Sequence, residues 1–167
     1  MPLQPGQSTL ESILEKELER LLGWVRAVET RTSFIIPLST GMLGALAALA
    51  PTSTPWTFPA AISSSIALIL LALSLASCAL AAFPRTTGPK GSLIYFGGIS
   101  TMELEQYAAA MKNLSVDAYI DDLVRQCHRN AQIAERKYAW IQRALGCLFL
   151  GAAPWTLSVF LLYTTRV

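Results

Sequence analysis

Polar and strongly apolar stretches alternate along this chain, and two of the apolar stretches carry no charge. No Asp, Glu, Lys or Arg occurs between Arg31 and Arg85, and a second charge-free run separates Arg143 from Arg166. A helix that spans a bilayer needs roughly 20 apolar residues. The first run therefore predicts two spanning helices joined by a turn, and the second run predicts one.

This pattern predicts an all-α membrane protein with three transmembrane helices, a cytoplasmic helical region and an N-terminal amphipathic helix. The expected parts are the amphipathic helix (1–31), a transmembrane hairpin (32–83), the cytoplasmic helical segment (84–143), the third span (144–163) and an external tail (164–167). Pro37 is expected near the start of the first span, where a missing amide donor costs least.

The N-terminal helix has one apolar face. Ser8-Thr9-Leu10-Glu11 matches a capping box and predicts the helix start, and apolar residues then recur in steps of four and three at Leu14, Leu18, Leu21, Val25 and Val28. This face is suited to packing on the cytoplasmic segment, to lying on the membrane, or to pairing with a second copy. The acidic first half disfavours anionic lipid, so packing on protein is the favoured interpretation.

Small and hydroxyl-bearing residues mark both helices of the hairpin. On the first span, small residues form a candidate helix-packing face, for which we favour packing within one chain over contact between protomers: Gly41, Gly44, Ala45 and Ala48. The second span carries five serines, whose hydroxyls are expected to bond back to their own helix rather than to form a polar seam: Ser63, Ser64, Ser65, Ser74 and Ser77.

The polar segment begins with an aromatic and glycine-rich run. Leu93–Ile99 predicts a short extended stretch interrupted by paired glycines, and Ser100–Glu103 matches a second capping box for a helix that ends near Asn113. The paired glycines fit either an anion site or a tight turn, and the turn is favoured. From Ser115 a helical pattern continues without a break into the third span, which would couple the cytosol to the membrane mechanically.

The basic residues lie almost entirely on one side of the predicted spans. All of the 13 Lys and Arg residues except Arg166 precede the first span or separate the second from the third. The positive-inside bias therefore places the N-terminus and residues 84–143 in the cytoplasm and the C-terminus outside. The net charge of +2 is too small to indicate a nucleic acid polymer as a partner.

No pattern in the chain indicates an enzyme, a cofactor or a metal site. The three cysteines are interpreted as small apolar residues. Cys127 and His128 are adjacent, but adjacent residues on a helix point about 100° apart. Arg129, Arg136 and Arg143 form a basic stripe that suits topology or lipid headgroups, while Arg125 or Arg129 could instead bind an anionic ligand.

Several segments together resemble a known family. LIYFGGIS, MELEQYAAAM, DDLVRQ and AERKYAWIQRA, placed between a two-span block and a third span, resemble the transmembrane effector of Pycsar, a bacterial anti-phage system. The resemblance extends from about Trp24 to Tyr163 and is strongest from Leu93 to Leu145. Glu29-Thr30-Arg31 stands where that family has an acidic-x-Lys element, so this chain has Arg where Lys is commoner.

The resemblance implies a multi-pass protein of the bacterial inner membrane. A partner cyclase would make cyclic CMP or cyclic UMP on infection, and the effector, as a homo-oligomer in contact with membrane lipid, would then disrupt the membrane and cause abortive infection. Under this implication Arg125 and Arg129 would bind the phosphate, and Tyr95 and Phe96 would stack on the base. Gly97, the next residue, would also belong to the binding site. The alternative is a ligand-independent membrane scaffold or holin-like protein.

Overall fold

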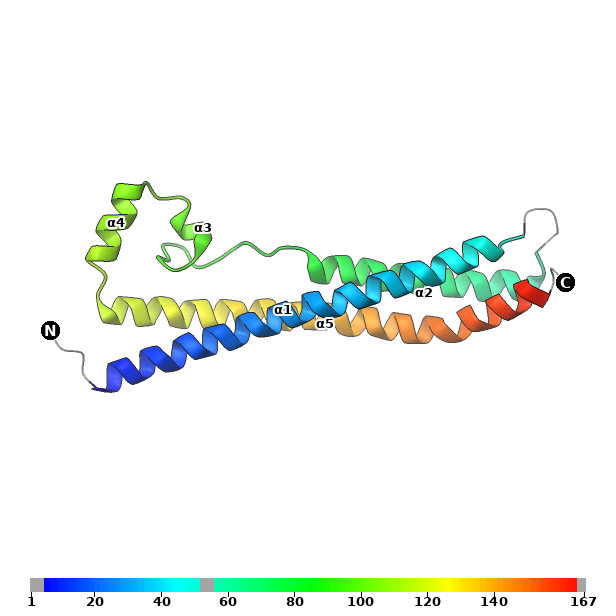
Figure 1. The fold of residues 1–167 in the computed structure, drawn as a ribbon, viewed down its shortest axis with the longest axis horizontal. Helices are drawn as coiled ribbons and strands as arrows, with labels where there is room; N and C mark the ends of the chain where they lie inside the picture. Colours follow the sequence, from blue (N-terminus) through cyan, green and yellow to red (C-terminus); the bar gives the residue numbers. More distant parts are fainter. Residues whose placement is uncertain (1–4, 52–55, 165–167) are drawn as a thin grey trace. The chain divides into compact units, whose positions relative to one another are not determined.

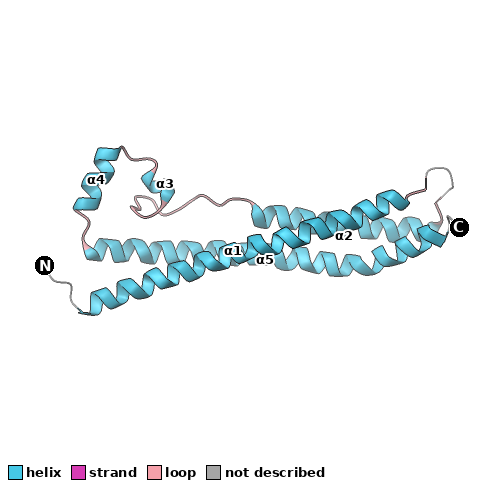
Figure 2. Cartoon of the chain, in the orientation of Figure 1, coloured by secondary structure: helices cyan, strands magenta, loops and turns pink. Residues whose placement is uncertain are grey.

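The described part of the chain forms five helices, of which three are long. The computed structural model describes residues 5–51 and 56–164, with side chains described from residue 8. The helices are α1 (Pro5–Leu49), α2 (Phe58–Ala82), α3 (Phe96–Ile99), α4 (Leu104–Lys112) and α5 (Val116–Thr164) (Figure 1). Within these ranges there is no strand (Figure 2). Three helices, α1, α2 and α5, are long and apolar enough to cross a membrane, which confirms the predicted fold class.

The chain divides into two compact units. One, called here the polar unit, comprises the chain up to Ala27 together with Pro84–Arg136. The other, called here the apolar unit, comprises Val28–Phe83 and the chain from Lys137 onward. Helices α1 and α5 each contribute residues to both units, whereas α2 belongs to the apolar unit alone.

Two predictions about α1 are wrong. The helix begins at Pro5 rather than at Ser8, because the fixed φ of proline suits the first turn of a helix. The helix also continues without a break into the first span, so that Pro37 lies in its interior and not near its start. Proline has no N–H to donate to the carbonyl four residues earlier, here that of Ser33.

In the apolar unit, α2 packs through a face made mostly of small residues. Lipid tails are as apolar as leucine, so close packing rather than burial from water holds spanning helices together. The buried residues of α2 recur at helical spacing: Ala60, Ser63, Ala67, Leu71, Ser74, Ser77, Cys78 and Ala81. Leu71, Cys78 and Ala81 form one core cluster with α1 and α5, to which those helices contribute Val28, Ile35, Ile141, Ala144 and Leu148.

One serine of α2 forms a hydrogen bond to another helix across this core. The Ser74 hydroxyl is fully buried and donates to the Ala144 carbonyl of α5 at 2.9 Å, and the Ser39 hydroxyl of α1 lies 3.5 Å from it. Ser63 and Ser65 bond back to their own helix as predicted. The prediction is wrong for Ser74, whose hydroxyl joins α2 to α5, and for Ser64, whose buried hydroxyl has no hydrogen-bond partner among the described residues.

The small-residue face of α1 is open. A Cβ placed on Gly41 or Gly44 would meet no atom within 4 Å, and both glycines and Ala48 are exposed. The prediction that this face packs within one chain is therefore wrong. It fails because α1 turns a different side to α5, where the Trp155 indole N–H donates to the Met42 carbonyl at 2.8 Å.

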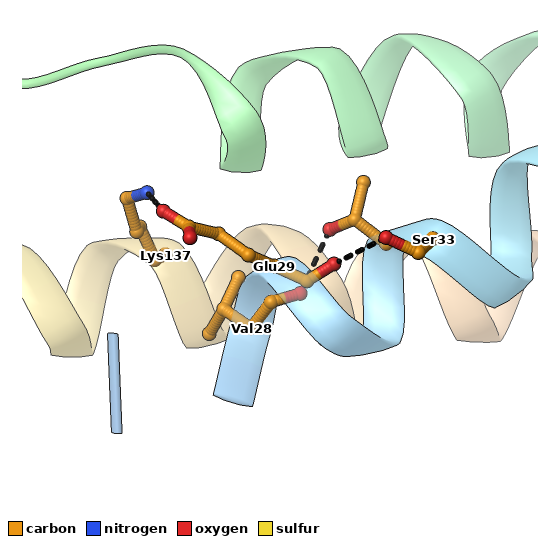
Figure 3. Close-up of polar contacts among 5 residues, drawn as sticks. Val28, Glu29, Ser33 and Lys137 are labelled. Carbon is orange, nitrogen blue, oxygen red and sulfur yellow. Dashed lines mark hydrogen bonds and ion pairs between the residues drawn. The ribbon is translucent and has the colours of Figure 1, made fainter. Parts of the chain in front are cut away.

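An ion pair joins α1 to α5 where both helices enter the apolar unit. Lys137 Nζ lies 3.5 Å from Glu29 Oε1 (Figure 3). On the next turn of α1, the hydroxyls of Thr32 and Ser33 donate to the carbonyls of Val28 and Glu29. These contacts satisfy polar groups at the end of the apolar core.

Two glycines of α5 allow the packing in the apolar unit to be tested. A Cβ on Gly151 would lie 3.2 Å from the Leu70 Cβ of α2, whereas a Cβ on Gly146 would meet nothing within 4 Å. We expect Gly151→Leu to push α2 away and to cost about 1–3 kcal/mol, as overpacked cores do. Thermal unfolding in detergent should show a lower midpoint for Gly151→Leu and a nearly unchanged one for Gly146→Leu. Equal midpoints would contradict this packing.

Candidate functional site

The N-terminal half of α1 packs on α5 in the polar unit, as the apolar pattern predicted. Leu21 is buried, the Cys127 thiol donates to the Leu14 carbonyl at 3.5 Å, and the Tyr119 hydroxyl donates to Glu15 at 2.8 Å. The exposed residues Leu10 and Ile13 lie outside the packed face. Thus the face with steps of four and three is the one that contacts α5.

This packing shifts two ionisations in the same direction. Burial, the hydrogen bond to Glu15 and the charges of Glu15, Glu11 and Asp122, in that order of size, together raise the pKa of Tyr119 to about 12. Burial also raises the pKa of the Cys127 thiol, with a contribution from the charge of Glu17. A thiol reacts as its thiolate, so the raised pKa lowers the reactivity of Cys127.

A buried serine fixes the segment that follows α2 onto α5. Ser92 is 2% exposed, and its hydroxyl donates to Asp122 Oδ2 at 2.9 Å. The Ser92 hydroxyl oxygen in turn accepts from the buried Gln126 amide at 2.9 Å and from the N–H groups of Ile94 and Tyr95. The Leu93 N–H also donates to Asp122 Oδ2. Residues 92–95 are therefore held in a turn against α5.

The turn leads into a helix, so the predicted extended run at Leu93–Ile99 is wrong. Residues Phe96–Ile99 form α3, a single turn. The two glycines serve close packing: a Cβ on Gly97 would collide with the Tyr95 ring, and one on Gly98 would collide with the Ser92 carbonyl. Any larger side chain at these positions would open the turn. The need for a tight turn therefore accounts for the two glycines, and no bound anion is required to explain them.

The second predicted capping box is also wrong. Ser100 follows α3 and its hydroxyl donates back to the Gly97 carbonyl, while α4 begins at Leu104 with Glu103 as its N-cap residue. The predicted end near Asn113 is confirmed. Ser115 caps the next helix, since its hydroxyl accepts from the Ala118 N–H, and α5 then runs unbroken to Thr164 as predicted.

The two arginines singled out in the sequence have different surroundings. The Arg129 guanidinium donates to the Thr87 carbonyl from Nε at 2.7 Å and also to the Thr87 hydroxyl, and it reaches Gln132 from Nη1. Its donors are thus used to hold the segment after α2. Arg125 is exposed and lines a cavity.

Two neighbouring cavities occur in the polar unit. The first, of about 250 Å³, is lined by residues from the turn and from α5, including Lys90, Ser92, Asp121, Asp122 and Arg125. The second, of about 360 Å³, is lined by Thr86, Gly88, Pro89, Lys90, Gly91, Tyr95, Gly97, Gly98 and Thr101. Lys90 and Gly91 line both cavities. Gly91 has a positive φ of 74°, a conformation that glycine adopts freely.

The structure divides the five sequence-predicted residues between these cavities and their rims. Tyr95 and Gly97 line the second cavity and Arg125 lines the first, whereas Phe96 is 64% exposed and lies outside the lining of both. Arg129 is bound to Thr87. Sequence reasoning missed Lys90 in the shared wall, although its place in the Pro-Lys-Gly turn directly before the aromatic run is a usable signal.

Taken together, the fold defines a class of protein: a membrane-spanning helical bundle with a polar unit that contains open cavities. The model of the Pycsar effector protein domain, PycTM, matches residues 13–164 and so covers parts of both units. The chain belongs to this family of effectors.

One curated relative supports the same assignment. The Pycsar effector protein PtPycTM of Propioniciclava tarda is 31% identical over 103 residues, which are 52% of this chain and 51% of the relative. The chain therefore aligns with about half the length of that protein. No solved structure matches the chain.

We expect the Ser92 hydroxyl to be essential for the order of the turn. Ser92→Ala leaves the buried Gln126 amide and one Asp122 contact without a partner, at a cost of about 1–3 kcal/mol. Hydrogen exchange at the amides of residues 93–95 should then become faster. Ser100→Ala, which removes a hydroxyl bonded only to the nearby Gly97 carbonyl, is the matched control. Unchanged protection in Ser92→Ala would refute the role of this serine.

A pH titration tests the contact between Tyr119 and Glu15. Because the folded pKa of Tyr119 is raised to about 12 from an ordinary value near 10, the stability it contributes is complete below about pH 10 and is lost as pH rises through 12. Ultraviolet difference spectra should show one tyrosine ionising near pH 12, and Tyr119→Phe should remove that step. Glu15→Gln should move the step toward lower pH. A titration in which Tyr119→Phe changes nothing would contradict the assignment.

Proposed function

We propose that this chain is the membrane-acting effector of an anti-phage defence, and that its polar unit binds a cyclic pyrimidine mononucleotide, cyclic CMP or cyclic UMP, made by a partner cyclase. The observation that carries the proposal is the family match over residues 13–164. Ligand binding would shift the chain toward a state that disrupts the membrane, which requires different affinities for the two states.

The second cavity is the better candidate for the ligand. Its volume of about 360 Å³ falls within the usual range for small-molecule sites. Lys90 is the one charged residue in its lining, so the cavity suits a singly charged cyclic phosphate. The first cavity instead combines Lys90 and Arg125 with Asp121 and Asp122, whose charges offset one another.

The aromatic contact is better supplied by Phe96 than by Tyr95. The Tyr95 hydroxyl donates to the Thr86 carbonyl, and the backbones of Gly88 and Gly97 crowd its ring. Phe96 is largely exposed and its ring centroid lies 4.6 Å from that of Tyr95. An exposed ring beside the cavity can stack on a pyrimidine base. Arg129 supports the site indirectly through its hydrogen bond to Thr87. Arg125 lines the first cavity, which shares Lys90 with the second.

The proposed setting is the bacterial inner membrane, with the N-terminus and the polar unit in the cytoplasm and the C-terminus in the periplasm. The distribution of basic residues supports this orientation. A homo-oligomer is part of the proposal. The open face at Gly41 and Gly44 supports it, because small residues let helices of neighbouring copies approach closely in lipid.

Dye entry and ligand binding test this function together. Cells that express the chain with an active pyrimidine cyclase should admit propidium iodide, and cells with an inactive cyclase should not. Lys90→Ala and Arg125→Ala should reduce dye entry, and Lys90→Ala should weaken calorimetric binding of cyclic CMP or cyclic UMP roughly 10- to 100-fold through loss of a charged hydrogen bond. Arg129→Ala should affect the site only indirectly, by loosening the segment around Thr87.

Lys112→Ala is the matched control, because Lys112 is an exposed cation of the same unit that lines neither cavity. It should behave as the parent chain. Dye entry that does not depend on the cyclase would favour the holin-like alternative. Absence of entry under every condition, with normal expression, would favour a membrane scaffold and refute the effector mechanism.

A further inference from the structure

Lys137 is a buried cation in a protein unit that is otherwise almost free of charge. Its side chain is 5% exposed, and Nζ lies 3.5 Å from Oε1 of Glu29. The Glu29 side chain is 60% exposed and points from α1 toward Lys137 on α5 (Figure 3). Burial of an ammonium group is costly unless the group is paired. Lys137 therefore depends on Glu29 far more than Glu29 depends on Lys137.

The pair lies where the apolar unit begins. Val28 and Lys137 are the first residues of that unit on α1 and α5. Val28 directly precedes Glu29 on α1, and Ile141 lies one turn after Lys137 on α5. Both residues belong to the apolar core cluster. The Arg31 guanidinium also lies 5.3 Å from the Tyr138 ring centre and adds a second contact between the same two helices. The ion pair thus closes α1 on α5 at one end of the core.

We propose that Glu29 and Lys137 form a releasable latch that keeps α1 closed on α5 in the resting protein, and that activation opens it. The proposal of activation rests on the function proposed above. Glu29 can leave the pair cheaply, since its carboxylate already has access to water. Once Glu29 has left, the buried Lys137 ammonium lacks its counter-charge, which favours a state in which its side chain moves out and the helices separate locally. The latch is therefore bistable rather than gradually adjustable.

This mechanism predicts an asymmetry between the two partners. Glu29→Gln leaves a buried ammonium without its counter-charge and should open the latch. Lys137→Met leaves only a hydrated, exposed carboxylate and places an apolar side chain of similar length in the buried site, so the helices should remain closed. Lys137→Met added to Glu29→Gln should restore the closed state. An ordinary exposed ion pair would respond little, and equally, to loss of either partner.

A native thiol reports the opening. Cys78 is fully buried in the cluster that contains Val28 and Ile141. In a full-length chain with Cys127→Ala and Cys147→Ala, Cys78 is the remaining cysteine. Its alkylation by N-ethylmaleimide in lipid vesicles should accelerate at least about tenfold in Glu29→Gln, because one partner of a buried pair is lost. Lys137→Met and the double variant should stay within about threefold of the parent chain.

Glu17→Gln is the matched control, since Glu17 pairs with Arg20 on the exposed surface of α1. It should leave the alkylation rate unchanged. Restoration by the double variant excludes a general failure to fold. Equal rates for Glu29→Gln and the parent chain, or equal acceleration by Lys137→Met, would overturn the latch.

Dye entry separates the latch from the proposed function. Glu29→Gln should admit propidium iodide into cells without any cyclase, whereas Lys137→Met should not. Fast alkylation in Glu29→Gln without dye entry would overturn the role of the latch in activation. If the parent chain with an active cyclase admits no dye, the effector function fails, while the alkylation rates still decide whether the latch exists.

Discussion

Polar groups that the helices bury need partners on neighbouring elements, and this requirement determines how both compact units are held together. In lipid no water is present to supply a missing partner. The Ser74 hydroxyl therefore donates to the Ala144 carbonyl, and the Trp155 indole to the Met42 carbonyl. Each bond joins two different helices of the apolar unit, α2 to α5 in the first case and α5 to α1 in the second. Ser74 lies within the packed face of α2, so there packing and polar pairing depend on the same small residue.

The polar unit meets the same requirement with a different geometry. The connection after α2 has little regular structure, so most of its backbone groups have no helical partner. Asp122 and Gln126 lie one turn apart on α5 and meet Ser92 together, which gives the connection a fixed point. Arg129, a further turn away, binds Thr87. One face of α5 therefore serves as the scaffold on which both cavities are formed.

The sequence predicted the helices well because their signal is periodic. The steps of four and three at Leu14, Leu21 and Val28 mark the face of α1 that is packed, and the three helices that are long and apolar enough to cross a membrane each lie at least partly within a charge-free run. The helix starts at Ser8 and Ser100 were wrong, because capping motifs are short and Pro5 and the one-turn helix α3 override them.

The candidate site was harder to predict because it depends on contacts distant in sequence. Ser92 lies 30 residues from Asp122 and 34 from Gln126, and none of the three stands out by residue type. Likewise, Arg125 and Arg129 were equal candidates in the sequence, although the fold uses the donors of Arg129 for Thr87 and leaves Arg125 at a cavity. Local patterns identify which residues are charged, but only the fold decides which charges remain available to a ligand.

Lys137 illustrates the same point in energetic terms. A methionine would fill a similar volume without needing a carboxylate on α1, and replacement of buried ion pairs by apolar residues is often neutral or stabilising. Stability alone therefore does not account for the pair with Glu29. Since one partner is buried and the other is exposed, the cost of separating them falls almost entirely on the lysine. Such an arrangement favours a contact that holds firmly when closed and separates completely when opened, which is what the proposed activation requires.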